Sequence, residues 1–296
     1  MKLVVFISVF LIALAVFLTT RSSANSDSDT QRKLEEPKDN AQLEQWKAAI
    51  DANALPAIRL VLTGRPADST TASKVGGEPF WPSEKPYPTS GKGEPLQFLA
   101  QINFAEIAEP LADYPTSGLL QFFISADDLY GSDFTRPGTD DSKNHDYAIV
   151  FHERFDAEDH VGAPSVTLSE DDYLPFRGES AVTFESVSSR PSPLDYRFDA
   201  LLPGVRQRYD ETEPLYDYAI DSPSHQIGGY AVFTQTDPRS YEGKDEDWQV
   251  LLQLDSQTIG DLDMMWGDVG IANFFIRPSD LAARDFSQVW YNWDCH

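Results

Sequence analysis

Short stretches in which apolar and polar residues alternate make up much of the chain after residue 55. The segments LQFLAQI (residues 96–102) and YAIVFHERF (residues 147–155) have this two-residue period and are rich in aromatic and β-branched side chains. Segments of this kind, separated by turn residues, are typical of β-strands. A helical period occurs after Asn40, and a shorter one is expected at residues 278–286. The pattern predicts an α+β fold that is mostly β.

The beginning of the chain has a different pattern. An uncharged apolar run of 18 residues begins at Leu3, and a membrane-spanning helix needs roughly 17–25. The small residues at positions 22–24 also suit a signal-peptidase site. Residues 1–24 are therefore either a membrane anchor or a cleaved signal peptide, and both place the rest of the chain in the periplasm or cell envelope. The polar residues 25–40 predict a disordered tether.

The chain contains an internal repeat at an offset of 152 residues. Residues 73–135 align without a gap with residues 225–287 and share 18 identities in 63 positions, where unrelated sequences would share roughly four. This predicts the duplication of a β-rich unit, with a pseudo-two-fold arrangement of the two copies. The predicted domain covers residues 41–296, with repeat one at about 57–155, a connecting region at about 156–224 and repeat two at 225–296.

Several residues recur at the same places in both copies, and we expect them to be structural. Paired glycines inside a strand indicate a bulge or a tight bend. A recurring glutamine is expected to satisfy backbone groups, and an aspartate before a leucine is expected to cap a short helix. The residues concerned are Gly76, Gly77, Gly228, Gly229, Gln101, Gln253, Asp128 and Asp280.

The combination of blocks resembles a known family. SKVGGEPFWP, PLQFLAQINF and GLLQFFISADDLYG are followed in order by HQIGGYAVFTQTDPR, LLQLDS, MMWGDVGIANFFI and YNWDC. Together these blocks resemble the YwqG-like family, also called the domain of unknown function 1963, over about residues 73–295. The resemblance implies a bacterial protein with a β-rich, duplicated fold. It implies no particular activity.

Charge and motifs exclude several function classes. The chain has 23 basic and 48 acidic residues, a net charge of −25, which repels nucleic-acid backbones and anionic lipid headgroups. We therefore expect no nucleic-acid partner and membrane contact only through the N-terminal segment. The single cysteine, Cys295, allows no intramolecular disulfide. The sequence has no HExxH, GxSxG, GxGxxG or phosphate-binding loop motif.

Candidate chemistry is sought where the two copies differ. The segment LDSQTIGDLDMMWGD carries carboxylates where the first copy has Asn103, Glu109, Leu111 and Thr116. Clustered carboxylates bind a divalent cation or act as acid and base, although a solvated acidic turn is the simpler interpretation. The loop departs from the calcium-binding EF-hand pattern at Met265. The candidate ligand-binding residues are Asp255, Asp261, Asp263, Asp268 and Trp266.

The sequence thus predicts an exported, acidic protein whose role is non-catalytic binding of a protein or small ligand, with a groove between the two copies as the expected place. The alternative is a metal-assisted hydrolase that uses the four aspartates. No cofactor is expected, apart from a divalent cation at those residues. The pattern does not identify a partner or a substrate.

Overall fold

The computed structural model describes the chain from residue 40 onwards, with gaps. The apolar N-terminal run and residues 25–39 of the predicted tether lie outside this part, so these predictions stay open. Within the described residues, no helix is both long enough and apolar enough to cross a membrane. The described ranges are 40–132, 146–164, 173–206, 214–215, 217–220, 224–241 and 247–296.

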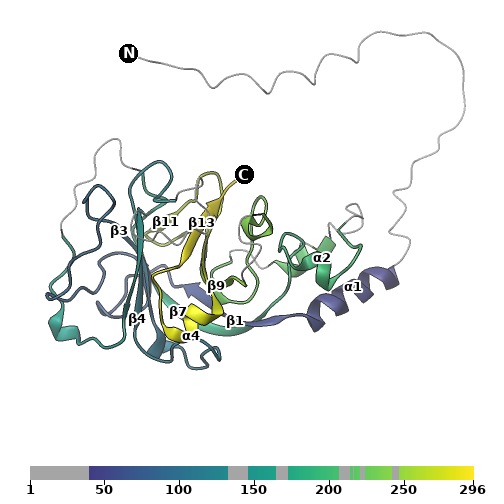
Figure 1. Ribbon diagram of the computed structural model, residues 1–296, viewed down its shortest axis with the longest axis horizontal. Helices are drawn as coiled ribbons and strands as arrows, with labels where there is room; N and C mark the ends of the chain where they lie inside the picture. The colour runs from purple at the N-terminus through teal and green to yellow at the C-terminus, as the bar shows by residue number, and fades with distance from the viewer. Residues whose placement is uncertain are drawn as a thin grey trace, which may run out of the picture. The chain divides into compact units, whose positions relative to one another are not determined.

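A ten-stranded antiparallel sheet forms the centre of the fold (Figure 1). Its strand order is β13-β12-β9-β8-β1-β7-β2-β3-β4-β5. On each side of the central pair β1 and β7, the strands follow one another in chain order towards the edge. The strands are β1 (Leu55–Leu62), β2 (Lys74–Gly76), β3 (Gln97–Asn103), β4 (Leu119–Ile124), β5 (Tyr147–His152), β7 (Glu179–Ser189), β8 (Gln226–Gly228), β9 (Gln249–Asp255), β12 (Ile271–Ile276) and β13 (Trp290–Asp294).

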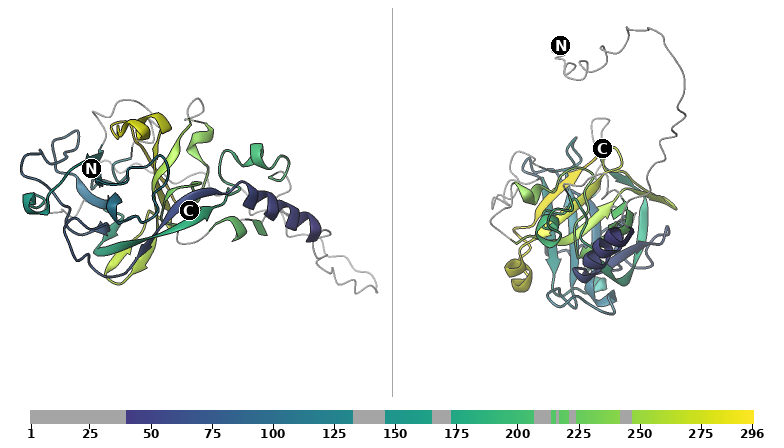
Figure 2. Two further views of the ribbon diagram at one scale, coloured as in Figure 1. Left: turned by 90° about the horizontal axis from the view of Figure 1, so that it is seen from below. Right: turned by 90° about the vertical axis from the view of Figure 1, so that its right-hand side faces the viewer.

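Apart from the 13-residue helix α1, the remaining elements are short. A three-stranded sheet has the order β10-β11-β6, and α1 leads almost directly into β1 (Figure 2). The prediction of a mostly β, α+β fold is confirmed in this coarse form. These elements are β6 (Phe176–Arg177), β10 (Gln257–Ile259), β11 (Leu262–Met264), α1 (Asn40–Ala52), α2 (Phe198–Leu201), α4 (Pro278–Ala283) and the 3-10 turns Phe104–Glu106, Ala157–Asp159 and Pro238–Ser240.

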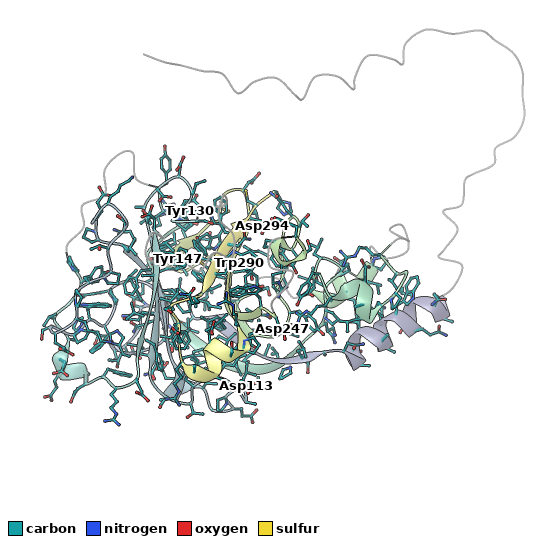
Figure 3. The ribbon with its side chains drawn as sticks, in the orientation of Figure 1. Asp113, Tyr130, Tyr147, Asp247, Trp290 and Asp294 are labelled. Carbon is teal, nitrogen blue, oxygen red and sulfur yellow. The ribbon has the colours of Figure 1, made fainter. Side chains whose placement is uncertain are left out.

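The main core lies between the two ends of the curled sheet. Phe122 of β4 meets Phe274 of β12 with 4.9 Å between ring centroids, and the Tyr147 hydroxyl of β5 donates to the Val289 carbonyl at 2.7 Å. Tyr147 and Trp290, both labelled in Figure 3, mark the two edge strands. Every residue of β4 and of β12 is buried. These two strands are therefore covered on both faces, which explains why each has only one polar residue, Gln121 in β4 and Asn273 in β12.

Equivalent contacts recur at the offset of 152 residues. The strand register shifts at Leu99 of β3 and at Leu251 of β9. The side-chain oxygen of Gln101 accepts the Phe80 N–H at 3.2 Å, and that of Gln253 accepts the Val232 N–H at 2.7 Å. The side-chain amides donate to Ala72 and Ser224 carbonyls, respectively. Both glutamines thus hydrogen-bond backbone groups of the segment beside their strand.

The glycine pairs have the same backbone conformation in both halves. The φ angles are 69° and 74° at Gly76 and Gly77, and 72° and 71° at Gly228 and Gly229. Other residues rarely adopt this left-handed region. At Gly76 a side chain is also excluded by contact, because an added Cβ would lie 2.2 Å from the Gly178 carbonyl oxygen. The predicted structural role of the pairs as backbone bends is consistent with this geometry.

The predicted caps at Asp128 and Asp280 are wrong. Asp127, one residue earlier, makes the local turn, because its carboxylate accepts the N–H groups of Leu129 and Gly131 at 2.9 and 3.0 Å. Asp280 lies inside the first turn of α4, whose N-cap is Arg277. There the Asp280 carboxylate accepts from the Arg277 guanidinium at 3.2 Å. A cap needs non-helical backbone before the first turn, and the helix begins too early for Asp280 to provide it.

The predicted connecting region contains a strand, expected at AVTFESV (residues 181–187), whose place in the sheet the sequence pattern did not specify. Strand β7 runs for 11 residues and pairs with β1 on one side and β2 on the other. It therefore lies at the middle of the large sheet rather than in a linker. This position brings the centre of the chain next to both halves of the fold.

Candidate functional site

A small cavity opens where β1, β7 and β8 meet. Its volume is about 30 Å³, and one water-sized group needs roughly 10–15 Å³. The cavity therefore has room for about two such groups, enough for one end of a ligand. We call it the arginine pocket; its lining residues are Arg59, Val187, Ser188, Ser189, Arg190, Ala219, Ser224, His225, Gln226 and Val232.

The pairing of β1 with β8 determines which side chains of β1 face the arginine pocket. In the β1·β8 pair, Arg59 lies opposite Gln226 and Ala57 lies opposite Gly228. Because side chains alternate between the faces of a strand, Arg59 lies on the face opposite to the buried core residue Ile58. Ile58, Leu60 and Leu62 of β1 thus face the main core, whereas its one charged side chain faces the cavity.

Two guanidinium groups border the pocket, and each side chain is 36% exposed. Arg59 lies 3.8 Å from Glu185, an exposed pair that stabilises the fold weakly. Arg190 is held more firmly, because its Nε donates to Asp51 at 2.7 Å and its guanidinium lies 4.5 Å from the centre of the Tyr218 ring. Hydrogen bonds from Tyr218 and then Arg190 lower the pKa of Asp51.

The histidine of the pocket is fixed in one tautomer. His225 accepts the Asp255 N–H at Nδ1, with a distance of 3.0 Å. Its Nε2 therefore carries the hydrogen and donates it to the Gln257 side-chain oxygen at 2.8 Å. Burial lowers the pKa of His225, which keeps the ring neutral near pH 7. Both ring nitrogens are engaged within the fold, so His225 is positioned as part of the wall and not as a free base.

The remaining polar groups give the pocket a rigid lining. The Gln226 side-chain amide donates to the carbonyls of Gly228 and Tyr230 at 3.1 and 2.6 Å. The Ser189 hydroxyl oxygen accepts the Tyr230 N–H at 2.9 Å. These bonds tie the wall to the glycine turn after β8. The arrangement combines two cations with hydroxyl groups, which suits the recognition of an anionic group.

One of the predicted ligand-binding residues lies beside the pocket. The Asp255 carboxylate accepts the N–H groups of Ser224, a lining residue, and Ser256, both at 2.7 Å. The pocket wall thus depends on Asp255, although Asp255 is not itself among the lining residues.

The other predicted residues lie elsewhere. Asp263 accepts from Thr258 and Arg177, each at 2.7 Å, and these hydrogen bonds lower its pKa. Asp261 and Asp268 are exposed. Trp266 is completely buried in the main core. It therefore contributes to packing and offers no face to a ligand at the surface.

The four aspartates do not form a metal-ligand set. In the part of the chain that the structure describes, no three His, Cys, Asp or Glu side chains lie together in a way that could hold a metal ion. Asp255 ends a strand of the large sheet, whereas Asp263 belongs to β11 of the small sheet. Nearness in sequence therefore did not produce convergence in space. The metal-assisted hydrolase stays a prediction that the described geometry does not support.

Sequence reasoning missed the arginine pocket because its lining comes from separate segments. One signal was present in the repeat alignment, where Lys74 of the first copy falls on Gln226 of the second. A change from a cation to an amide at a recurring strand position is as informative as the acidic substitutions. This change was missed because only positions at which the second copy carries an additional carboxylate were considered.

The family comparison decides what this chain is related to. The model for the family described as "Domain of unknown function (DUF1963)" matches residues 73–295. The chain belongs to this family. The suspected family is thereby confirmed, and the match shows no activity for the DUF1963 domain. A search of curated proteins finds no match. In this chain the DUF1963 match covers β2 to β13, whereas α1 and β1, which carries Arg59, precede it.

Proposed function

We propose that this protein is a non-catalytic binding domain that holds the anionic group of a small ligand in the arginine pocket. The observation that carries the proposal is the placement of Arg59 and Arg190 around a cavity lined by serine hydroxyls. A net charge of −25 repels anions at long range. Local cations at a partly enclosed site therefore provide the attraction that the surface as a whole lacks.

The lining supports binding more than catalysis. Its histidine has both ring nitrogens engaged, and the hydroxyl oxygens of Ser189 and Ser224 accept hydrogen bonds from Tyr230 and Gln253. A nucleophilic serine needs a base within hydrogen-bonding reach, and the hydrogen bonds of His225 go to other groups. Rigid donors around a small cavity lower the ordering cost of binding.

Calorimetric titration of the full chain with acetate, phosphate and sulfate at constant ionic strength tests the proposal. We expect at least one of these anions to bind, and the Arg59→Gln change to weaken binding at least tenfold by removing a charge-assisted contact. Arg177→Gln is the matched control, because Arg177 is 83% exposed and pairs with Asp263. Binding that is equally strong in the wild type and Arg59→Gln, or no binding of any anion, would contradict the proposal.

The domain further consists of two equivalent units produced by duplication, which exchange their first strands. The first strand of one unit, β1, pairs with β8 of the other, and the first strand of the second unit, β7, pairs with β2 of the first. Support comes from the strand order around β1 and β7 and from the recurring register shifts. We expect residues 40–155 and 173–296, co-expressed as separate chains, to form one folded complex, detected by size-exclusion chromatography and circular dichroism. A stable folded monomer of either fragment alone would contradict this exchange of strands.

The domain acts outside the cytoplasm, held there or exported by residues 1–24. Support comes from the apolar run that follows Lys2. Sequencing the mature N-terminus and treating intact cells, after permeabilising any outer membrane, with protease distinguishes the cases. A chain that keeps residue 1 and is protected from protease in such cells, but is cleaved after lysis, would contradict this localisation.

A further inference from the structure

We infer that the anionic group held by the arginine pocket is a carboxylate, an inference that rests on the proposed function. The reason lies in the other half of the fold. At the place that corresponds to the arginine pocket, the first half carries a carboxylate of its own. Comparison of the two places identifies the chemistry that fits the second.

Strand register defines the correspondence. On the first side, Glu179 of β7 lies opposite Gly76, and Ala181 lies opposite Lys74. On the second side, Ala57 of β1 lies opposite Gly228, and Arg59 lies opposite Gln226. Each of these strand pairs thus contributes one cation, from β2 in the first half and from β1 in the second. The carboxylate of Glu179 corresponds to the methyl group of Ala57.

The first half shows how a carboxylate is held there. Glu179 accepts the Ala67 N–H at 3.1 Å and lies 3.9 Å from the Lys74 ammonium. Its side chain also covers the backbone of Gly77, because a Cβ added to Gly77 would lie 2.4 Å from the Glu179 carboxyl carbon. Burial lowers the pKa of Lys74, and the charges of Glu179 and Glu78 act in the opposite direction. The carboxylate therefore compensates a cation that is only 3% exposed.

The second half has the cation and the glycine turn, with Ala57 at the position of Glu179. The carboxylate that pairs with Arg59 there is that of Glu185, 3.8 Å away across β1 and β7. A cavity of about 30 Å³ lies beside Arg59, with room for about two oxygen-sized groups. A carboxylate has two oxygens in one plane, which match the flat donor fork of a guanidinium. A tetrahedral phosphate or sulfate is bulkier and carries more charge, which is less favourable in a strongly acidic protein. The rest of the ligand would lie outside the cavity.

Thermal unfolding of the full chain in acetate, and separately in phosphate and sulfate at matched ionic strength, tests the inference. At ten times the dissociation constant we expect acetate to raise the melting temperature by about 3 °C, and phosphate and sulfate to have smaller effects. The acetate shift should fall to about 1 °C or less in Arg59→Gln, because binding is at least tenfold weaker, and should be unchanged in Arg177→Gln. A second variant, Ala57→Glu, supplies the corresponding carboxylate from within, so we expect it to abolish the acetate shift.

The outcomes separate the two proposals. A shift with phosphate or sulfate that depends on Arg59, without one from acetate, overturns the carboxylate and leaves anion binding in place. No shift with any anion, or an acetate shift that is undiminished in Arg59→Gln, overturns both. If Ala57→Glu does not fold, Arg59→Gln with the anion panel still decides. An acetate shift that persists in a folded Ala57→Glu protein contradicts the correspondence between the two halves.

Discussion

Replacing Arg239 by methionine is expected to lower the free energy of unfolding by about 3–5 kcal/mol, because it leaves buried carboxylates without their cation. Arg239 is 1% exposed, and its closest charged partners, Asp195 and Asp237, are 0% and 1% exposed. Its guanidinium donates to Asp237 at 2.9 and 2.7 Å and to Asp195 at 3.0 Å. Urea denaturation of wild type and variant measures the difference.

The rest of the network explains why the loss is large. Burial raises the pKa of Asp195, but hydrogen bonds from Arg197 and the charges of Arg239 and Arg197 outweigh it and lower the pKa overall. Arg239 also donates to the Trp248 carbonyl at 3.1 Å and lies 4.7 Å from the centre of the Phe275 ring. Removing it therefore breaks charge pairs, a backbone contact and a packed aromatic contact together.

Two controls separate the buried network from charge in general. Arg177→Met removes an exposed guanidinium that pairs with Asp263, and we expect a loss below about 1 kcal/mol. Combining Arg239→Met with Asp195→Asn and Asp237→Asn removes the uncompensated charges, so part of the loss should be recovered. If Arg239→Met costs no more than Arg177→Met, the network does not stabilise the fold in this way.

This network also shows where sequence reasoning stops. Asp237, Pro238 and Arg239 have the composition of an exposed turn, and their local sequence contains no sign of burial. They are buried because Asp195, some 40 residues earlier in the chain, lies against them. Long-range placement of this kind depends on the packing of the whole domain, which a single short segment does not specify.

More of the fold than of the site could be predicted from the sequence. The alternation of apolar and polar residues predicted strands such as β3 and β5, because this pattern is a property of the local sequence. The central position of β7 depends on which strands pair, a non-local property. The pocket is harder still, since Arg59 and Arg190 come from β1 and the end of β7. Of the four predicted aspartates, only Asp255 lies beside the pocket, where its carboxylate accepts the N–H of the lining residue Ser224.

Gln253 provides the second large expected effect. Replacing it by leucine should lower the free energy of unfolding by about 3–5 kcal/mol, because each buried polar group left without a partner costs about 1–3 kcal/mol. The Gln253 oxygen accepts the buried Val232 N–H at 2.7 Å, and its amide nitrogen donates to the carbonyl and hydroxyl oxygens of Ser224 at 2.9 and 2.7 Å. Leucine has similar volume and replaces none of these bonds.

Gln249, on the same strand, is the matched control. Its side-chain nitrogen is buried and has no hydrogen-bond partner among the described residues, so Gln249→Leu should cost less than about 1 kcal/mol or stabilise the protein. Because Gln253 connects β9 to the residues that flank the pocket, Gln253→Leu should also increase hydrogen exchange at the Val232 amide, whereas Gln249→Leu should not. Equal losses in the two variants would mean that strand β9 responds to any loss of an amide, and that the bonds of Gln253 have no special role.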